Sequence, residues 1–290
     1  MDAGDYDLGD VDIAWCPGCG NFMIHRALKG ALAELDLKPE ETVIVSGIGQ
    51  AAKMPQYIRT NFFNGLHGRS LPAATAIKAV NPGLTVIAES GDGCMYGEGG
   101  NHMVHAMRRN PDITCLVHNN MVYGLTKGQA SPTTRPGFHT PIQTRGVVAQ
   151  PLDPLATAVA ANCSYVARAF AGDEDETRGI IRDAMEHKGF SLVDILQPCV
   201  SYNRVNTFRW FKDRIYYLDG DHDPADRLAA FERAIENERL PLGLIYRVDR
   251  PPFEVSLAPY LEGDLKPLFR RQTRMDALVD LVESLRGDQG

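Results

Sequence analysis

Short apolar runs rich in β-branched residues recur along the chain, and they alternate with segments in which apolar positions have helical spacing. The apolar runs predict strands over residues 42–47, 84–89, 113–118, 165–170 and 191–196. The segments between them predict helices over residues 21–35, 71–80, 97–109, 153–161 and 173–187, the first of them capped by Asn21. This alternation is typical of an α/β fold with five or six parallel strands flanked by helices.

The sequence changes character after Cys199. The pattern there shows aromatic clusters at residues 208–211 and 216–217, a predicted helix over 223–238 and a predicted extra strand over 243–248. We therefore expect an α/β domain over residues 1–200 and a C-terminal extension over residues 201–290. The aromatic clusters fit either a contact with a partner or a small satellite core.

Polar residues follow two of the predicted strands. Gly91-Asp92-Gly93 comes after strand 84–89, and Asn119-Asn120 comes after strand 113–118. The carboxyl ends of parallel strands meet at one edge of a sheet, so Asp92 and Asn120 are expected in one crevice. With the main-chain carbonyl of Val122 they offer three oxygen donors, which suits Mg²⁺ holding a diphosphate. The alternative is that both motifs are only turns, since Gly, Asp and Asn favour turns by themselves.

Cysteine spacing singles out the sequence Cys16-Pro-Gly-Cys19 before the first helix. A CxxC pair fits a redox dithiol, half of a zinc site or part of an iron-sulfur cluster. A thioredoxin-like motif requires a preceding strand, and none is predicted before Cys16. A zinc site would need a second CxxC pair, and none follows. Cys199 comes directly after Gln197-Pro198 at the end of the last strand, where a loop would bring it near the CPGC turn. Cysteines 94, 115 and 163 lie at or within apolar runs and are expected in the core.

A long segment with little predicted regular structure, residues 126–151, follows Asn120 and Val122 directly. Loops of this length within a compact domain are usually functional or disordered. Its position favours a cover over the bound cofactor.

Composition limits the classes of function. The chain has 290 residues, 44% of them hydrophobic, and a formal net charge of -7. The acidic balance argues against non-specific nucleic-acid binding, which depends on clustered Lys and Arg. No apolar run has the length of a membrane span, and the acidic start lacks the features of a signal peptide, so we expect a cytoplasmic protein without membrane contact.

A set of motifs resembles the beta subunits of 2-oxoacid:ferredoxin oxidoreductases, and the GDG and NN motifs alone resemble the diphosphate-binding domain of thiamine-diphosphate enzymes. In chain order the motifs are CPGCG at 16–20, SGIG at 46–49, LHGR at 66–69, GDG at 91–93, NMVYGLTKGQ at 120–129 and PC at 198–199. The resemblance covers roughly residues 12 to 210. It implies thiamine diphosphate, Mg²⁺, one [4Fe-4S] cluster and pairing with an alpha subunit.

The activity that this resemblance implies is the oxidative decarboxylation of a 2-oxoacid with coenzyme A, giving an acyl-CoA, CO₂ and reduced ferredoxin. The stretch 125–132 is most similar to the 2-oxoglutarate branch, although pyruvate enzymes share much of it. In this family the glutamate that activates the cofactor's aminopyrimidine ring belongs to the alpha subunit.

Residue roles are carried over from the same resemblance. Lys127 would meet the anionic substrate, and His67 would act beside it near the cofactor. Asp92, Asn120 and the Val122 carbonyl would hold Mg²⁺, while Cys16, Cys19 and Cys199 would hold the cluster. The remaining cofactor-binding positions would be Gly18, Gly47, Ile48, Gly49, Gly68, Arg69, Gly91, Gly93, Gly124, Leu125 and Thr126.

One position departs from the family pattern. A fourth cluster cysteine usually follows the GIG motif, and Gln50 stands there in this chain. Either the fourth iron has another ligand, or the cluster is more labile, or it is absent. Two other classes therefore stay open: a non-redox thiamine-dependent lyase, and a scaffolding or regulatory subunit without cofactor.

Overall fold

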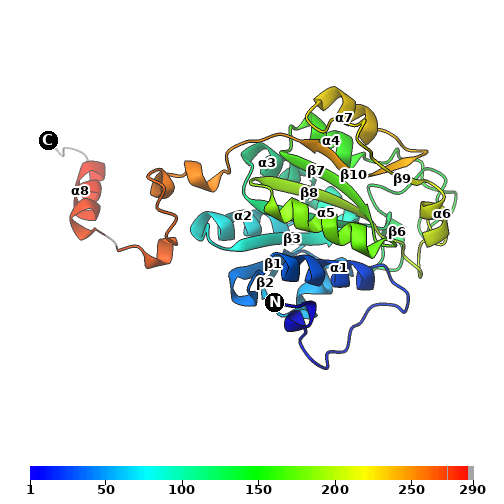
Figure 1. The fold of residues 1–290 in the computed structure, drawn as a ribbon, viewed down its shortest axis with the longest axis horizontal. Helices are drawn as coiled ribbons and strands as arrows, with labels where there is room; N and C mark the ends of the chain where they lie inside the picture. The colour runs from blue at the N-terminus through cyan, green and yellow to red at the C-terminus, as the bar shows by residue number, and fades with distance from the viewer. Residues whose placement is uncertain (273, 287–290) are drawn as a thin grey trace.

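The computed structural model describes residues 1–272 and 274–286, and its centre is an eight-stranded sheet (Figure 1). The strand order across the sheet is β2 (Asn61–Asn64), β1 (Thr42–Ser46), β3 (Thr85–Gly91), β4 (Ile113–Asn119), β8 (Phe190–Leu196), β7 (Tyr165–Phe170), β10 (Leu240–Arg247) and β9 (Ile215–Tyr217). The strands from β2 to β7 pair in parallel, whereas β10 is antiparallel to β7. The predicted parallel α/β fold is confirmed.

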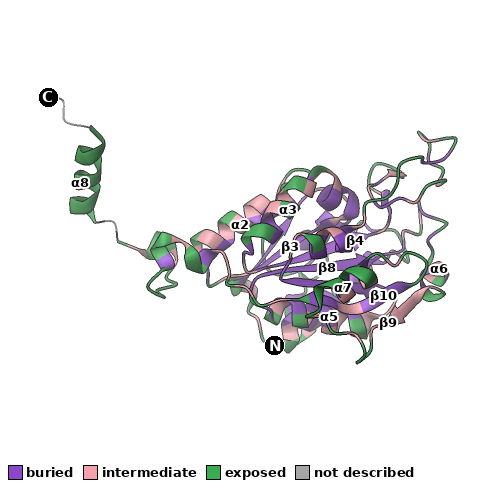
Figure 2. Ribbon diagram, turned by 90° about the horizontal axis from the view of Figure 1, so that it is seen from above, coloured by how far each residue is buried: buried purple, intermediate pink, exposed green. Residues whose placement is uncertain are grey.

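Helices cover both faces of the sheet. The structure places α1 (Asn21–Glu34) and α5 (Glu174–Glu186) on one face, and α2 (Ser70–Val80), α3 (Gly100–Arg109), α4 (Pro154–Ala160) and α7 (Arg227–Ala234) on the other. Alternate residues of each strand point to opposite faces of the sheet. Ile44 packs against the layer of α1 and α5, and its neighbours Val43 and Val45 pack against the layer of α2 and α3. The central strands are buried throughout (Figure 2), which explains their unbroken apolar runs.

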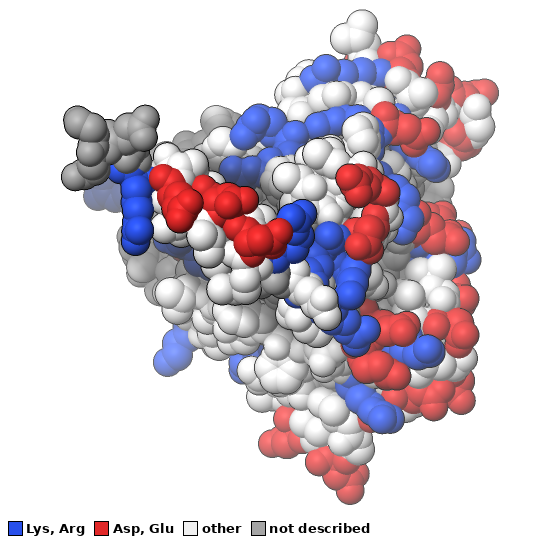
Figure 3. Space-filling view, turned by 90° about the vertical axis from the view of Figure 1, so that its left-hand side faces the viewer, with Lys and Arg blue, Asp and Glu red and all other residues white. Residues whose placement is uncertain are grey.

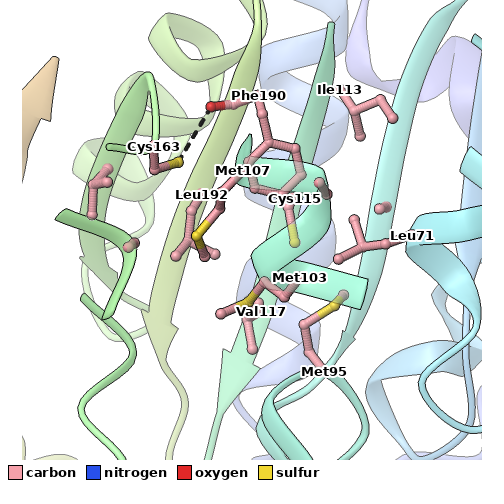
Figure 4. Packing of buried hydrophobic residues seen from close by; sticks show 14 of the residues in the cluster. Leu71, Met95, Met103, Met107, Ile113, Cys115, Val117, Cys163, Phe190 and Leu192 are labelled. Atoms are coloured by element: carbon pink, nitrogen blue, oxygen red, sulfur yellow. Dashed lines mark hydrogen bonds between the residues drawn. The ribbon is translucent and has the colours of Figure 1, made fainter. Parts of the chain in front are cut away.

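Sulfur-containing side chains form part of the core between the sheet and α3 (Figure 4). Cys115 and Cys163 are fully buried there, close to Met103 and Met107. The Cys163 thiol lies 3.5 Å from the carbonyl oxygen of Phe190. Burial raises the pKa of Cys163 to about 12, so this thiol stays protonated and acts as a small core side chain, as predicted.

Several local predictions were wrong. The first helix has Gly20 at its N-cap without a side-chain bond, and Asn21 instead lies with Oδ1 2.8 Å from Nδ1 of the buried His118. The helix expected over 223–238 is the shorter α7, because Asp226 caps it and its side chain accepts from the Leu228 and Ala229 amides. Strands β2 and β9 were not predicted: both are short and lie at the two edges of the sheet.

Residues after 200 continue the same sheet through β9 and β10 and then leave the body. The aromatic cluster at α6 (Phe208–Lys212) forms a satellite core, because Phe211 is buried against Phe170 and Leu196. Residues 251–260 still pack on the body, where Tyr260 is buried and donates from its hydroxyl to the Ala79 carbonyl at 2.9 Å. Beyond residue 260 the chain forms an arm that projects from the body and ends in α8 (Met275–Arg286), whose residues are all exposed (Figures 1 and 2). No helix among the described residues is long and apolar enough to span a membrane.

Candidate functional site

The carboxyl ends of β1, β3, β4 and β8 meet at one edge of the sheet, because these four strands are parallel neighbours. A cleft of about 460 Å³ lies there. Eleven of the predicted cofactor-binding residues line it: Ile48, Gly49, His67, Gly91, Asp92, Gly93, Asn120, Val122, Gly124, Leu125 and Thr126. Folding thus collects segments that are far apart in sequence into one site.

Asp92 forms the floor of this cleft. Its side chain is 1% exposed and accepts hydrogen bonds from Ser131 Oγ at 2.5 Å and from Thr133 Oγ1 at 2.6 Å. Burial raises the pKa of Asp92 to about 6, although the two hydroxyl donors act in the opposite direction. Placing a cation beside this carboxylate would offset the cost of its buried charge.

Two asparagines follow β4 and have different partners. Asn119 donates from Nδ2 to Asp194 Oδ1 at 3.0 Å, and Thr133 Oγ1 lies 3.0 Å from its side-chain oxygen. Asn120 faces the cleft: its Oδ1 accepts from the Val122 amide at 3.0 Å. Asp92, Asn120 and Val122 therefore lie together, as the sequence predicts for a magnesium site.

Cys94 holds the loops of the cleft together. Its buried sulfur accepts from the Ile48 amide at 3.4 Å and from the Gly68 amide at 3.1 Å. A Cβ at Gly47 would lie 2.5 Å from this sulfur, so only glycine fits at that position. Cys94 thus joins the GIG, HGR and GDG motifs, a role that its apolar surroundings in the sequence did not indicate.

A second pocket adjoins the first and contains three thiols. Cys16, Cys19 and Cys199 line it together with Gln50 and Trp15, which confirms that the loop after β8 brings Cys199 beside the CPGC turn. Burial, with smaller contributions from Cys199 and Cys16, raises the pKa of Cys19 to about 11. The cleft and this pocket share the lining residues Gln50, Asn120 and Gly124.

Gln197 connects the two pockets through hydrogen bonds. Its Oε1 accepts from Asn120 Nδ2 at 3.0 Å, and its Nε2 lies 3.5 Å from the Cys19 sulfur. Glycine is required at the neighbouring position 20, where a Cβ would lie 2.9 Å from the Gln197 side chain. Sequence reasoning did not identify this bridge, since nothing in the spacing of Gln197 distinguishes it from an ordinary strand end.

Other predicted site residues lie outside the lining of the cleft. Gly68 must be glycine, because its φ of +67° and the Glu98 backbone 2.4 Å from an added Cβ exclude any side chain there. Gly18 and Arg69 are exposed, the first in the CPGC turn and the second at the start of α2. Lys127 is exposed in the turn that follows Thr126, with φ of +77°.

Comparison with known proteins gives the family. The family model "Thiamine pyrophosphate enzyme, C-terminal TPP binding domain" matches residues 43–195, and the model for the C-terminal part of the pyruvate ferredoxin oxidoreductase beta subunit matches residues 199–262. The beta subunit of 2-oxoacid:ferredoxin oxidoreductase 1 from Aeropyrum pernix is 44% identical over 244 residues, 80% of this chain and 77% of the relative. The chain belongs to the 2-oxoacid:ferredoxin oxidoreductase beta subunits.

Further relatives of this beta subunit extend the similarity over nearly the whole chain. The beta subunit of the 2-oxoacid:ferredoxin oxidoreductase from Sulfolobus sp. is 38% identical over 92% of this chain and 94% of its own length. A solved structure of 2-oxoglutarate:ferredoxin oxidoreductase from Magnetococcus marinus, with 2-oxoglutarate, coenzyme A and succinyl-CoA bound, matches with a TM-score of 0.90 and 34% identity. That match covers 97% of this chain and 96% of the solved chain, so it includes the C-terminal arm.

The beta subunit has two sets of candidate ligands, the oxygen donors of the cleft and the thiols of the second pocket. Over residues 1–272 and 274–286, no three His, Cys, Asp or Glu side chains converge as ligands for a single metal ion. The oxygen set at the cleft contains only one carboxylate, and the thiols of a four-iron cluster each bind a different iron, so neither set requires such convergence. Both sets fit the donor chemistry of the groups that the resemblance implies.

Proposed function

We propose that this beta subunit, paired with an alpha subunit, catalyses the thiamine-diphosphate- and coenzyme-A-dependent oxidative decarboxylation of 2-oxoglutarate. Electrons would pass through a [4Fe-4S] cluster in the three-thiol pocket to ferredoxin. The observation that carries the proposal is that the cofactor cleft and the three-thiol pocket share Gln50, Asn120 and Gly124. A redox group in one pocket would therefore lie beside the cofactor in the other.

The donors at the cleft support the cofactor assignment. We assign Mg²⁺ to Asp92, Asn120 and the Val122 carbonyl, which are hard oxygen donors suited to this cation. Thiamine diphosphate, when bound, would supply the electron sink for decarboxylation. The chain's own contribution is to bind the diphosphate through the metal and to orient it with the GIG and GDG loops, which Cys94 holds together.

Asp92→Ala tests the cofactor assignment. Removing one carboxylate from a hard-cation site should abolish measurable binding of thiamine diphosphate with Mg²⁺ in calorimetry of the assembled enzyme. The matched control is Asp175→Ala on α5, where the side chain is exposed and pairs with Arg178. Wild-type cofactor affinity in Asp92→Ala would contradict the magnesium site.

We assign the C-terminal extension, and above all its arm, to contacts with the alpha subunit. Ten large apolar side chains from residue 261 onward are exposed: Leu261, Leu265, Leu268, Phe269, Met275, Leu278, Val279, Leu281, Val282 and Leu285. On the face that carries the arm, basic and acidic side chains are interspersed (Figure 3), so docking there would depend on apolar contact more than on charge of one sign. The isolated chain should be inactive, because the activating glutamate of this family lies in the alpha subunit.

The substrate assignment depends on comparison and on assay. The Magnetococcus marinus structure has 2-oxoglutarate bound, and residues 125–132 resemble that branch. The purified complex should reduce a viologen dye with 2-oxoglutarate and coenzyme A faster than with pyruvate. A preference for pyruvate would contradict the substrate assignment and leave the proposed reaction and cofactors unchanged. Decarboxylation without dye reduction, in an iron-free complex, would favour a non-redox lyase.

A further inference from the structure

Gln50 carries a buried oxygen without a partner. Its Oε1 atom is inaccessible to solvent and accepts no hydrogen bond. Leaving a buried polar atom unpaired costs stability, so such an atom needs a specific explanation. Gln50 lines both the cofactor cleft and the three-thiol pocket, so a Lewis-acidic group bound beside Cys16, Cys19 and Cys199 would give this oxygen a partner.

The position of Gln50 relative to the thiols is fixed by Trp15. The indole Nε1 of Trp15 donates to the main-chain carbonyl of Gln50 at 2.8 Å. Trp15 is itself buried, packs edge-on against Tyr57 at 5.0 Å between ring centroids, and directly precedes Cys16. The backbone of Gln50 and the CPGC turn are thus held together as one unit.

We propose that the side-chain oxygen of Gln50 is the ligand of the fourth iron, with Cys16, Cys19 and Cys199 binding the other three. This inference rests on the cluster in the proposed function. Each iron of a [4Fe-4S] cluster takes one ligand from the protein, and three thiolates leave one iron without a sulfur donor. A neutral amide oxygen binds iron more weakly than a thiolate, so the fourth iron is the most exchangeable of the four.

A defined oxidation follows from this ligand set. A [4Fe-4S]²⁺ cluster that loses one Fe²⁺ and one electron becomes [3Fe-4S]⁺, and ferricyanide is the oxidant that accepts the electron. The three cysteines stay bound to the three remaining irons. The released iron is the one bound to Gln50, whose amide carries no charge and needs no proton to dissociate.

The test compares Gln50→Cys and Gln50→Ala with the wild type in the anaerobically purified complex. One equivalent of ferricyanide should release about one iron in four from the wild type and produce the EPR signal of [3Fe-4S]⁺, whereas Gln50→Cys keeps its iron. Gln50→Ala should release this iron about tenfold faster than the wild type. Gln56→Cys, on the exposed end of the same segment, adds a thiol elsewhere and should behave as the wild type.

Two outcomes overturn the assignment of Gln50 while leaving the cluster in place. One is a wild-type cluster that retains all its iron like Gln50→Cys, and the other is an equal rate of iron loss in Gln50→Ala and the wild type. Iron and sulfide absent from every anaerobic complex would instead overturn the cluster of the proposed function, and the ligand role of Gln50 with it. Iron analysis alone separates these cases.

Discussion

Thr133 Oγ1 lies 2.6 Å from Asp92 Oδ2, although the two residues are 41 positions apart in the chain. Asp92 follows β3, whereas Thr133 belongs to the long segment that follows the short strand β6 (Gln129–Ala130). The segment predicted to cover the cofactor is therefore tied to the carboxylate that we assign to magnesium. Ser131 adds a second hydroxyl to the same oxygen at 2.5 Å.

We predict that Thr133→Val weakens binding of thiamine diphosphate with Mg²⁺ by roughly tenfold or more, since a hydrogen bond to a charged group contributes about 1.5–3 kcal/mol. Valine keeps the shape and removes the hydroxyl, so calorimetry of the assembled enzyme measures the loss of its contacts with Asp92 and Asn119. Thr133→Ser restores the hydroxyl and should restore affinity. Thr140→Val is the control, because Thr140 bonds to Gln143 in the same segment and has no contact with Asp92. Unchanged affinity in Thr133→Val would rule out this role.

The sequence predicted the central part of the fold well because its strands are buried on both faces. The run 113–118 reads as a strand and is β4, where Ile113, Leu116 and Val117 are at most 1% exposed. The edge strand β2 was missed because all four of its residues are exposed and its two phenylalanines are adjacent, without the apolar and polar alternation that predicts a strand.

The motifs predicted the lining of the cleft, but the supporting contacts were not predictable. Thr133 and Gln197 act through hydrogen bonds to residues 41 and 77 positions away, and no local spacing encodes such pairs. Asn21 shows the opposite error: its local position predicts a helix cap, yet its side chain lies beside His118 of β4, 97 positions away in the chain. Tertiary contacts override local preference at these positions.

The buried His25 on α1 gives a pH-dependent prediction. Burial, with a smaller contribution from the nearby charge of Lys29, lowers the pKa of His25 to about 4. Its Nε2 lies 3.1 Å from the Tyr57 carbonyl, so the neutral ring donates this hydrogen bond. As the pH falls below about 6.5, the unfolded chain binds a proton at this position and the folded chain does not, so stability is lost on acidification.

The free energy of unfolding should therefore fall by about 2 kcal/mol between pH 7 and pH 5 from this residue alone. Urea unfolding at the two pH values measures the total change. His25→Gln keeps a donor for Tyr57 and cannot be protonated, so its change should be smaller by that amount. His139→Gln, at an exposed histidine, should show the wild-type dependence. Identical pH dependence in His25→Gln would contradict this origin.

The apolar face of α8 gives a prediction about assembly. Leu281 and Leu285 are 54% and 77% exposed, one helical turn apart, so they form a continuous apolar face. Replacing both by Asp should reduce the alpha subunit recovered with the chain while leaving the thermal unfolding of the isolated chain unchanged. The paired control, Asp280→Asn with Glu283→Gln, alters other positions of the same helix. Full recovery of the alpha subunit with both leucines replaced would exclude the arm from the interface.

Lys127 provides the last prediction, and its exposed side chain makes the test direct. It follows Leu125 and Thr126, which line the cofactor cleft, and the turn that carries it is closed by the Gly128 amide donating to the Tyr123 carbonyl at 2.9 Å. A 2-oxoacid brings a carboxylate next to a bound diphosphate, so a cation at this point offsets the repulsion.

Lys127→Ala should raise the KM for the 2-oxoacid by roughly tenfold, the loss expected for a charged contact, and change the KM for coenzyme A much less. Lysine already adopts the left-handed backbone at this position, so alanine adds no new strain and the cofactor affinity should stay the same. Lys212→Ala on α6 removes an exposed lysine elsewhere and should leave both constants unchanged. Equal changes in both constants in Lys127→Ala would mean that the side chain acts on the fold of the turn and not on the substrate carboxylate.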